Sequence, residues 1–405
     1  MKLLLGVTGS IACYKSYDLC RELTKNGHEV IIILSNGATK FIRSETFKYL
    51  GAKEVYSADD DFNTDKYQDF SVLHIELSKW ADRLIVAPAS ANKISQFSHG
   101  YADDLLTSLF LAFTKSILIF PAMNTNMLNN KIINDNIKRL GELENVYIHG
   151  TKEGLLACGD IGEGKLEDID IIYELSLNYP IQVSKNLSDR KVLITTGSTI
   201  AHIDPVRFIT NPSSGLTGYE LAKAYLSKGF EVIVIAGHNP TEKVNMLRRF
   251  PRITFLQADT TEKMFRLVKD NLEKVDTYIS AAAISDIQFE VKEEKIKKDS
   301  QITLPTIKNA PDILKYVVEN KKHQKVIGFA AETSNLLENM QRKISSKPVD
   351  YLVGNLVSNG LKGEMIGFKS DTNEYSIING EKLLFQAKMT KRELALAILD
   401  LVEND

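Results

Sequence analysis

The chain has 405 residues, of which 43% are hydrophobic and 25% charged, and its formal net charge is −2. This composition is that of a soluble globular protein with two or three domains of roughly 150 residues each. The small net charge gives no electrostatic reason to expect a nucleic acid or a membrane surface as partner. Three cysteines cannot form a disulfide framework. The first apolar run is too short for a signal peptide, and none approaches a membrane span of roughly 18 residues, so we expect a cytoplasmic protein.

Short apolar runs rich in β-branched residues alternate with amphipathic helical stretches in the first half of the chain. A helical pattern over 11–27 ends on a glycine that suits a helix C-cap. Near-continuous Val, Ile and Leu runs joined by helices are typical of a parallel sheet covered on both faces. The predicted strands of this half cover residues 2–8, 28–35, 82–89 and 115–122.

The pattern lapses over 176–190 and then restarts, which predicts two domains, 1–183 and 184–405. The second half repeats the strand, turn and helix order of the first. We therefore predict an α/β fold with a mostly parallel sheet in each half, and a late hairpin over 366–378. The predicted strands of the second half lie within 191–198, 231–236, 276–283, 325–332 and 349–355.

Polar residues follow several predicted strands, where ligands bind in open parallel sheets. The turn GVTGSIACYKS after the first strand could hold an anion through Ser10 and helix N-terminal amides, but it is not a G-x-G-x-x-G sequence. The second strand ends without the acidic residue that binds an adenosine ribose, so NAD is disfavoured and a mononucleotide stays open. Ser90, Ala91, Asn92 and Asn124 also follow strands, and helix capping is the alternative explanation for them.

His74 lies in the sequence VLHIELSKWAD, in which Leu73, Ile75 and Leu77 alternate with polar residues. This alternation predicts a strand with His74 on the face opposite the leucines. A lone histidine is more often structural than catalytic, so the pattern alone does not assign it a role.

The first half resembles the FMN-dependent cysteine decarboxylases, and among them phosphopantothenoylcysteine decarboxylase. The resemblance rests on GSIACYKS, HIELSKWAD, PASANKIS, HGYADDLLT, PAMNTNM and ACGDIGEGKL, in this order over about residues 6–166. It implies a Rossmann-like, flavodoxin-type, three-layer domain with FMN bound between subunits, and a second Rossmann-like domain after it. It also implies that His74 is essential, as a base or by orienting the substrate, and that Asn124 binds the substrate carboxylate. The implied FMN contacts are Gly9, Ser10, Ile11, Ser35, Thr39, Ser90, Ala91 and Asn92, and the substrate contacts include Ala122 and Met123.

The resemblance places Cys158 on a flap, in the sequence GLLACGDIGEGKL. The resemblance implies that this thiol donates a proton rather than acting as a nucleophile, and the nearby Asp160 and Glu163 should favour the neutral form that proton donation needs. We expect the three following glycines to be hinges of this flap. Lys165 and Leu166 replace the Arg-Met that is usual in the family.

The second half resembles the phosphopantothenate–cysteine ligase domain of bifunctional bacterial coenzyme A biosynthesis proteins, through the sequence TTGSTIAHIDPVRFITNPSSGLTGYELAKAYLSKG. The resemblance implies that 4′-phosphopantothenate and CTP, with Mg²⁺, form an acyl-cytidylate that L-cysteine then attacks. The product is the substrate of the first half. Arg207 and Asn211 would stabilise the acyl intermediate and Lys295 the transferring phosphates. The implied nucleotide contacts are Ser280, Ala281, Ala282, Asp286, Lys295, Ala310, Pro311, Asp312, Ile313, Phe329, Lys343 and Lys347.

The ligase half departs from the usual family pattern at two places. Thr196-Gly197-Ser198-Thr199 stands where Gly-Gly-Thr is usual, and Leu216-Thr217 stands where the family has Lys-Met. The second change removes a cation near the predicted nucleotide site. The sequence does not decide whether the ligase uses CTP or ATP, and it does not identify the residues that bind the metal ion.

The leading interpretation is a bifunctional enzyme that forms homo-oligomers. The resemblance implies trimers of the flavin domain and dimers of the ligase domain, and hence a possible dodecamer. One alternative is a catalytically silent regulatory subunit with a flavoprotein fold, although the chain keeps His74, Cys158 and Lys295. The other is a nicotinamide-dependent two-domain reductase, against which the missing dinucleotide fingerprint counts.

Overall fold

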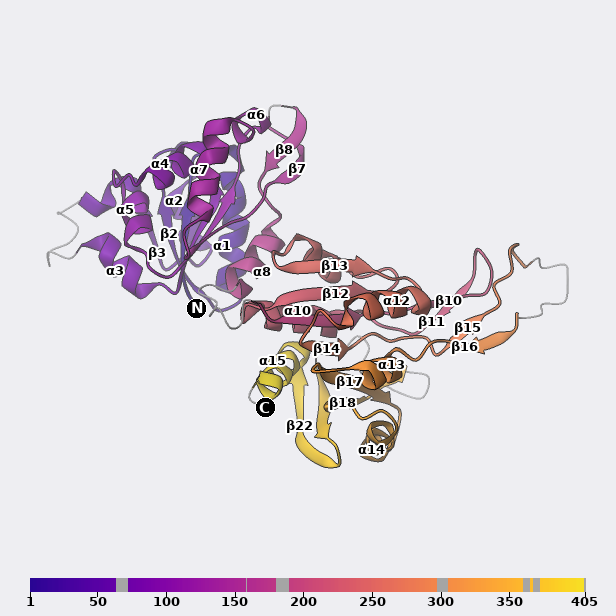
Figure 1. Cartoon of the computed structure of the whole chain (residues 1–405). Coiled ribbons are helices and arrows are strands. Elements are labelled where there is room, and N and C mark those ends of the chain that lie inside the picture. The colour runs from indigo at the N-terminus through magenta and orange to yellow at the C-terminus, as the bar shows by residue number, and fades with distance from the viewer. Residues whose placement is uncertain are drawn as a thin grey trace. The chain divides into compact units, whose positions relative to one another are not determined.

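The computed structural model describes residues 1–62, 72–157, 159–179, 189–296, 305–359, 365–366 and 372–403. The chain forms two compact units, Met1–Gln182 and Val183–Asp405 (Figure 1). The predicted proton donor Cys158 lies outside the described residues. Each unit is an α/β structure built on its own sheet, and this confirms the predicted fold class.

The first unit contains a six-stranded sheet in the order β3-β2-β1-β4-β5-β6, in which all neighbours are parallel. All four strands predicted for this half are present. Their apolar residues are almost all buried, as expected for a sheet covered on both faces. The strands are β1 (Lys2–Val7), β2 (Glu29–Leu34), β3 (Glu54–Ser57), β4 (Arg83–Ala89), β5 (Ser116–Pro121) and β6 (Val146–Ile148).

Helices cover both faces of this sheet. On one face, side chains of α3, α4, α5 and α7 pack with alternate strand residues such as Leu4 and Ile33 in one buried cluster. Helices α1 and α8 pack together and lie on the other face (Figure 1). The α-helices are α1 (Ser16–Lys25), α2 (Ser44–Tyr49), α3 (Leu73–Trp80), α4 (Ala91–His99), α5 (Leu105–Ala112), α6 (Thr125–Leu128), α7 (Lys131–Gly141) and α8 (Ile169–Asn178). The 3-10 helices are η1 (Ile11–Lys15), η2 (Ala38–Lys40) and η3 (Ala58–Phe62).

The predicted strand around His74 is wrong, because these residues form helix α3. Leu73 and Leu77 are buried and lie four residues apart on one helix face, whereas Ile75 is only partly buried. The same apolar spacing satisfies a period of two and, at i and i+4, a helical period. Packing of Leu73 and Leu77 against the core selects the helix.

Arg83 at the start of β4 is buried and holds the carboxyl end of α8. Its guanidinium donates hydrogen bonds to the carbonyl oxygens of Ser176 (2.7 Å) and Tyr179 (2.9 Å), and a longer one to that of Leu175 (3.3 Å). The carbonyl of Leu175 also accepts the amide of Tyr179 (2.9 Å), whereas those of Ser176 and Tyr179 belong to the helix end, where acceptors lack a partner within the helix.

Replacing Arg83 with methionine should lower the stability of the first unit by about 2–4 kcal/mol, because buried carbonyls lose a charged donor. Thermal unfolding followed by circular dichroism measures this loss. The matched control is Arg139→Met on the exposed side of α7, which should stay within about 0.5 kcal/mol of the unaltered protein. Equal melting temperatures for the two variants would contradict the role given to Arg83.

The second unit contains an eight-stranded sheet in the order β13-β12-β9-β14-β17-β18-β21-β22. Its strands are parallel from β13 to β18, and β21 and β22 join antiparallel at one edge. Of the late hairpin predicted over 366–378, residue 366 lies in β20 (Met365–Ile366), which pairs with β19 (Ser358–Asn359), and residues 372–378 lie in β21, which pairs with β22. The strands are β9 (Lys191–Thr196), β12 (Glu231–Ala236), β13 (Ile253–Gln257), β14 (Thr277–Ser280), β17 (Lys325–Glu332), β18 (Tyr351–Leu356), β21 (Thr372–Asn379) and β22 (Lys382–Thr390).

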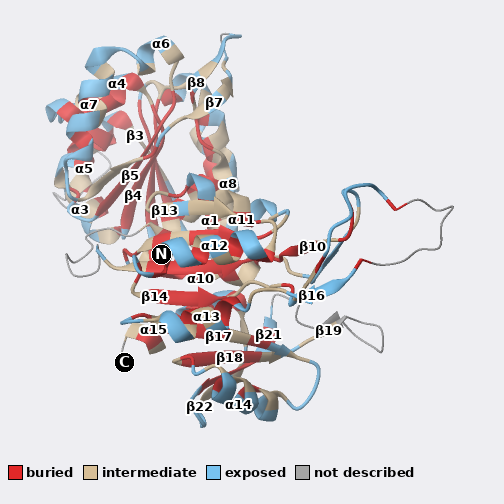
Figure 2. Cartoon of the chain, turned by 45° about the vertical axis from the view of Figure 1, so that its right-hand side comes forward, coloured by how far each residue is buried: buried red, intermediate tan, exposed pale blue. Residues whose placement is uncertain are grey.

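The helices of this unit pack against its sheet, and the buried residues concentrate in the strands and inner helix faces (Figure 2). The strands β10, β11, β15 and β16 extend beyond the sheet as an arm of paired strands (Figure 1). The helices are α10 (Leu216–Ser227), α11 (Glu242–Met246), η4 (Leu247–Arg249), α12 (Thr261–Leu272), α13 (Ile313–Asn320), α14 (Leu336–Ser346) and α15 (Lys391–Glu403). The remaining strands are β7 (Lys152–Leu155) and β8 (Ile161–Lys165) in the first unit, and β10 (Ile200–His202), β11 (Phe208–Thr210), β15 (Ile287–Phe289), β16 (Ile307–Asn309), β19 (Ser358–Asn359) and β20 (Met365–Ile366).

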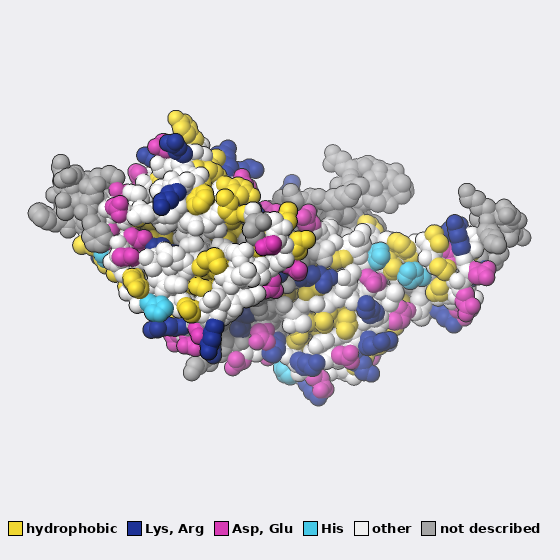
Figure 3. Space-filling view, turned by 90° about the horizontal axis from the view of Figure 1, so that it is seen from above, with side chains coloured by type: hydrophobic (Ala, Val, Ile, Leu, Met, Phe, Trp, Pro, Cys, Tyr) yellow, Lys and Arg dark blue, Asp and Glu magenta, His cyan; other side chains and the backbone are white. Residues whose placement is uncertain are grey.

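Basic and acidic side chains are intermixed on the face of the molecule drawn in Figure 3, in keeping with the small net charge. Within the described residues, every helix is too short or too polar to cross a membrane.

Candidate active sites

A pocket of about 630 Å³, called the main pocket below, opens in the first unit beyond the carboxyl ends of β1, β4 and β5. Nine of the eleven residues predicted to contact FMN or the substrate in this half line it. Ser35 lines an adjoining pocket of about 340 Å³, which shares Gly9, Ser90 and Asn92 with the first. Thr39 is exposed and lines neither pocket. The nine are Gly9, Ser10, Ile11, Ser90, Ala91, Asn92, Ala122, Met123 and Asn124.

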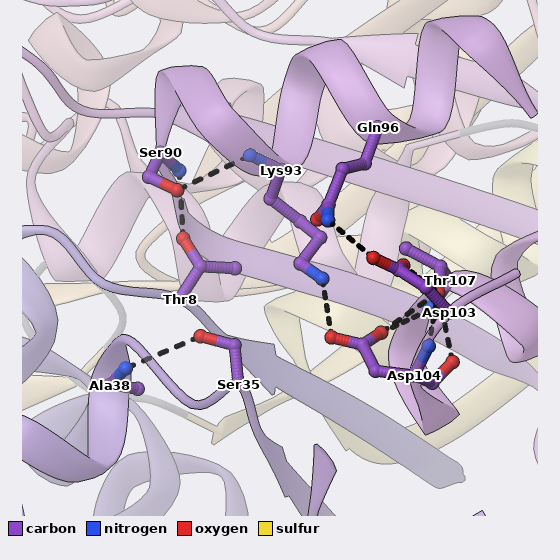
Figure 4. Close-up of polar contacts among 9 residues, drawn as sticks. All are labelled: Thr8, Ser35, Ala38, Ser90, Lys93, Gln96, Asp103, Asp104 and Thr107. Atoms are coloured by element: carbon purple, nitrogen blue, oxygen red, sulfur yellow. Dashed lines mark hydrogen bonds and ion pairs between the residues drawn. The ribbon is translucent and has the colours of Figure 1, made fainter. Parts of the chain in front are cut away.

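The turns after β1, β2 and β4 are held together by close backbone contacts. A Cβ atom on Gly9 would lie 2.8 Å from the Cα atom of Gly37, so the two turns approach as closely as they do only because both are glycine. Thr8 donates its hydroxyl to the carbonyl oxygen of Pro88 (2.8 Å). The same hydroxyl accepts a hydrogen bond from the amide of Ser90 (2.7 Å) (Figure 4). These contacts place the pocket's polar side chains on a rigid edge of the sheet.

The polar residues of the pocket also cap helices. Ser90 accepts a hydrogen bond from the amide of Lys93 (3.4 Å) at the start of α4, and Ser10 accepts one from that of Ala12 (3.4 Å). Asn124 accepts one from the amide of Asn126 (2.8 Å). Helix capping and ligand binding are therefore compatible roles for these residues, because each of them caps a helix and lines the pocket.

Asn124 offers a way to separate capping from ligand binding. Asn124→Asp keeps an acceptor for the cap, but it sets a carboxylate where the substrate carboxylate is predicted to bind. We expect Asn124→Asp to retain the melting temperature of the protein and to lower decarboxylation by about a hundredfold, since like charges in a pocket repel. Steady-state assay of carbon dioxide release measures the effect. Asn124→Ser, which also caps but carries no charge, is the matched control and should lose less activity.

A buried ion pair that the sequence did not reveal supports the adjoining pocket. The Nζ atom of Lys93 lies 2.6 Å from Oδ2 of Asp104, and the lysine side chain is only 3% exposed (Figure 4). Asp104 also caps α5 in a reciprocal capping box with Thr107. Gln96 donates a hydrogen bond to Asp103 (3.0 Å). The capping box was visible as the sequence DLLT, but the partner of Lys93 depends on the packing of α4 against α5.

The hairpin of β7 and β8 closes one side of the main pocket with Leu155, Leu156 and Ala157. The amide of Met123 donates a hydrogen bond to the carbonyl oxygen of Gly164 (2.9 Å), and the hydroxyl of Thr125 donates one to that of Glu163 (2.5 Å). Strand β8 is therefore fixed to the turn after β5.

The structure shows a steric reason for two of the three glycines predicted to be hinges, Gly162 and Gly164, and the hinge role itself stays a prediction. A Cβ atom on Gly164 would lie 2.2 Å from the carbonyl oxygen of Met123, and one on Gly162 would lie 2.6 Å from Oγ1 of Thr125. Both glycines allow close packing against the turn after β5. At Gly159 the Cβ position is open, and the φ angle of +90° is what favours glycine there.

Two lysines that sequence reasoning did not single out as contacts line the main pocket, Lys15 from η1 and Lys165 from β8. Partial burial, and then the positive charge of Lys165, lower the pKa of Lys15. Two cations that repel each other are stabilised by an anion between them. The pocket therefore suits a ligand that carries a phosphate or carboxylate group.

His74 does not line the main pocket of the described chain. Its Nδ1 atom lies 2.8 Å from Oδ2 of Asp61, and its backbone amide donates a hydrogen bond to Oδ1 of Asp61 (3.1 Å). The Asp61 side chain is 2% exposed and the His74 side chain 24%. A buried carboxylate fixes the ring and its tautomer, and leaves Nε2 as the atom available to a ligand.

In the second unit, a pocket of about 160 Å³ lies between the loop Pro212–Thr217 and the carboxyl ends of β14, β17 and β18. It is called the ligase pocket below, after the activity that the sequence predicts for this half. The predicted nucleotide contacts Ala281, Ala282 and Phe329 line it, and Ser280 is buried at the end of β14. Asn211, next to the loop, donates a hydrogen bond to the carbonyl oxygen of Ile284 (3.0 Å). The structure thus brings the loop Pro212–Thr217 close to the alanines that follow β14.

Most of the other predicted nucleotide residues form a connected cluster beside this pocket. Lys343 donates a hydrogen bond to the carbonyl oxygen of Phe329 (2.8 Å), and the Nζ atom of Lys347 lies 2.6 Å from Oδ2 of Asp312. Asp312 also caps α13, with the predicted contacts Pro311 before it and Ile313 after it. Burial and then the charge of Lys347 lower the pKa of Lys343.

Asp286 and Ala310 join this cluster, because the amide of Ala310 donates a hydrogen bond to the carbonyl oxygen of Asp286 (2.9 Å). The carboxylates of Asp286 and Asp312 act electrostatically on Lys343 and favour its charged form. The cluster therefore holds both signs of charge within reach of one another.

Arg207 and Lys295 do not line the ligase pocket; Arg207 lies in the turn between β10 and β11, and Lys295 lies in the segment that follows β15. Arg207 donates hydrogen bonds to Oδ2 of Asp204 (2.8 Å) and to the carbonyl oxygen of Ile296 (3.1 Å). Lys295, next to Ile296, is exposed. Arg207 thus contacts the residue next to Lys295, and neither cation lines the pocket that Ala281 and Ala282 line.

The first unit has the architecture of a nucleotide-binding flavoprotein, with its pocket at the carboxyl ends of a parallel sheet, and a second α/β unit follows it. The family described as "Flavoprotein" matches residues 1–179, and the family described as "DNA/pantothenate metabolism flavoprotein C-terminal domain" matches residues 187–404.

Relatives that contain both domains are similar to this chain over most of their length. The chain is 37% identical over 378 residues to the coenzyme A biosynthesis bifunctional protein CoaBC of Bacillus subtilis (strain 168), covering 92% of this chain and 89% of the relative. It is 36% identical over 415 residues to that of Vibrio vulnificus (strain YJ016), covering 100% and 97%. A crystal structure of the C-terminal domain of a CoaBC protein is 30% identical, with 55% of this chain and 100% of that chain covered and a TM-score of 0.43.

The chain belongs to the family of bifunctional coenzyme A biosynthesis proteins. This confirms the predicted function, a bifunctional enzyme that pairs the phosphopantothenoylcysteine decarboxylase of the pathway with its phosphopantothenate–cysteine ligase. The two alternatives, a silent regulatory subunit and a nicotinamide-dependent reductase, are set aside.

Proposed function

We propose that residues 184–405 join L-cysteine to 4′-phosphopantothenate at the expense of CTP, and that residues 1–183 decarboxylate the product with FMN. The observation that supports the proposal most directly is the main pocket, which gathers nine predicted contacts from separate strand ends into one volume. A pocket of about 630 Å³ is within the range of roughly 300–1,000 Å³ that is usual for small-molecule sites.

The residues of the main pocket fit FMN. The turns at Gly9 and Gly37 approach each other through backbone alone, and the start of α4 offers amides to a phosphate. Ser10, Ser90 and Asn92 supply hydrogen-bonding groups, and Ile11 and Ala91 supply apolar surface. FMN, when bound, would accept two electrons from the substrate thiol, so that the carboxylate can leave as carbon dioxide, and would return the same two electrons to the ene-thiol product.

The chain's own residues position the substrate beside that cofactor. Asn124 binds the carboxylate that leaves, and the hairpin of β7 and β8 covers the pocket and excludes water. His74, held by Asp61, acts on the substrate through Nε2, as a base or by orienting it. Cys158 returns a proton to the ene-thiol product.

Ligation proceeds in two balanced steps. A carboxylate oxygen of 4′-phosphopantothenate attacks the α-phosphorus of CTP, and pyrophosphate leaves; Mg²⁺, when bound, would neutralise part of its charge. The amine of L-cysteine then attacks the acyl carbon, loses a proton and expels CMP. Asn211 and Arg207 bind the acyl intermediate, while Lys295 neutralises charge on the transferring phosphates.

Homo-oligomers complete both sites. His74 lies outside the main pocket, and Arg207 and Lys295 lie outside the ligase pocket. A second copy of the chain that contributes these side chains would explain each separation. Dodecamers built from trimers and dimers, and a cytoplasmic location, stay predictions.

One set of assays tests the proposal. The purified protein should be yellow with an FMN spectrum, and a colourless protein that takes up NADPH would contradict it. Supplying 4′-phosphopantothenate, L-cysteine and either CTP or ATP should release pyrophosphate and carbon dioxide, which are followed separately. Release of pyrophosphate without carbon dioxide would support the ligase activity and contradict the decarboxylase activity. Light scattering of the same sample measures the oligomeric state.

A further inference from the structure

The ligase pocket has a wall that belongs to the last two strands and last helix of the chain. Tyr375 from β21 and Lys391, the first residue of α15, line it opposite the loop Pro212–Thr217. Neither residue was predicted as a contact. Tyr375 is paired across the sheet with Asn355 of β18, which also lines the pocket. Helix α15 packs against α10, whose first turn borders the same pocket.

The loop side of this pocket is built to receive an anion. Helix α10 is 12 residues long, and its N-cap residue Gly215 has no side chain. Among the described residues, the first amide of the helix, that of Leu216, meets a side chain only in a long hydrogen bond to the hydroxyl of Ser214 (3.5 Å). Leu216 and Thr217 of that turn line the pocket, as do the hydroxyl-bearing residues Ser213 and Ser214. The partial positive charge of a helix N-terminus favours phosphate groups at such a place.

Tyr375 is an independent sign of a polar ligand. The residue is 4% exposed, and its hydroxyl has no hydrogen-bond partner within the part of the chain that the structure describes. Burial raises the pKa of Tyr375 to about 12, so the hydroxyl is neutral and can donate a proton at working pH. Because Tyr375 lines the pocket, a ligand bound there can accept this hydrogen bond.

Lys391 is the only charged residue among the described residues that line this pocket. Its relative exposure is 8%, which is unusual for lysine. The loop itself carries Leu216 where the family pattern has lysine, so the loop brings no cation to the pocket. A ligand phosphate at the start of α10 therefore finds its positive side chain on α15.

We propose that Tyr375 and Lys391 form a phosphate-binding wall of the ligase site, and that Lys391 supplies the cation that the loop of this chain lacks. The proposal rests on the ligase activity proposed above. The phosphate is either the triphosphate of the nucleotide or the 4′-phosphate of phosphopantothenate, since both are phosphate anions and both are substrates.

The test uses the full-length holoenzyme with Tyr375→Phe and Lys391→Met, each close in shape to the original side chain. Titration calorimetry with CTP and Mg²⁺, and separately with 4′-phosphopantothenate, gives the dissociation constants. We expect an increase of about fivefold for Tyr375→Phe and of tenfold or more for Lys391→Met, with one of the two ligands. The KM of ligation for the same ligand should rise in parallel, while carbon dioxide release from added phosphopantothenoylcysteine stays unchanged.

The matched control is Lys388→Met, which removes an exposed lysine of β22 three residues away. A larger dissociation constant for CTP alone identifies the nucleotide as the source of the phosphate. A larger dissociation constant for 4′-phosphopantothenate alone identifies its 4′-phosphate as the source. Unchanged constants for both ligands in both variants would overturn the proposal. Because Tyr375→Phe removes a single oxygen atom, it stays informative even if Lys391→Met lowers the melting temperature. Ligation by the unaltered protein tests the proposed function separately.

Discussion

Gly164→Ala should lower decarboxylation by about a hundredfold or more, because a displacement of about 1 Å in an active site can cost that much. The added Cβ atom would lie 2.2 Å from the carbonyl oxygen of Met123, which is far inside contact distance. The φ angle of +120° at Gly164 is also one that other residues rarely adopt. Strand β8 must therefore move away from the turn that carries Met123 and Asn124, and the hydrogen bond between Met123 and Gly164 is lost.

Assays of carbon dioxide release and pyrophosphate release on the same preparation check this result. Ligation should be unchanged, because Gly164 belongs to the first unit. Gly162→Ala should have a smaller effect, since the atom it meets belongs to the side chain of Thr125. Gly150→Ala is the matched control, with no atom within 4 Å of the new Cβ. Full decarboxylation by Gly164→Ala would show that the hairpin does not have to sit where the structure places it.

The fold was predictable from the sequence wherever local pattern and tertiary packing agree. Strands such as β1 and β9 are continuous apolar runs, which only a buried strand of that length explains, and both were found. Because the strands are parallel, the polar residues after them had to meet at one edge of the sheet. Most of the main pocket could therefore be predicted without knowing any side-chain contact.

The rest depends on contacts between distant parts of the chain. The residues around His74 suit a strand and a helix equally, and the packing of Leu73 and Leu77 decides between them. The partner of Lys93 comes from another helix, and Lys391 reaches the ligase pocket from the last helix of the chain. No local pattern marks such residues, because lysine is ordinarily exposed.

Asp204→Ala should lower ligation by about a hundredfold, because one buried carboxylate holds the two segments that carry Arg207 and Lys295. Its Oδ1 atom accepts hydrogen bonds from the amides of Val206 and Arg207, both at 2.8 Å. Its Oδ2 atom accepts one from the guanidinium of Arg207 (2.8 Å) and one from the amide of Ile296 (3.2 Å). Without these acceptors Arg207 loses its orientation, and the segment next to Lys295 loses its anchor.

A positioning role for Asp204 predicts a loss in kcat for pyrophosphate release, with KM for CTP and the rate of decarboxylation little changed. Asp204→Asn should recover part of the activity, since its carbonyl oxygen can still accept the amides of Val206 and Arg207. Asp270→Ala on the exposed side of α12 is the matched control. Equal kcat in Asp204→Ala and Asp270→Ala would contradict the role.

The pH dependence of stability tests the same carboxylate. Burial would raise the pKa of Asp204, but the hydrogen bonds from the amides of Val206, Ile296 and Arg207, and the charge of Arg207, lower it to about 2. The usual value in an unfolded chain is about 3.9, so the carboxylate stabilises the folded protein fully above that pH. The difference in melting temperature between the unaltered protein and Asp204→Asn should be constant from about pH 8 to 5. It should shrink as the pH falls from about 4 towards 2, because the folded carboxylate then takes up its proton.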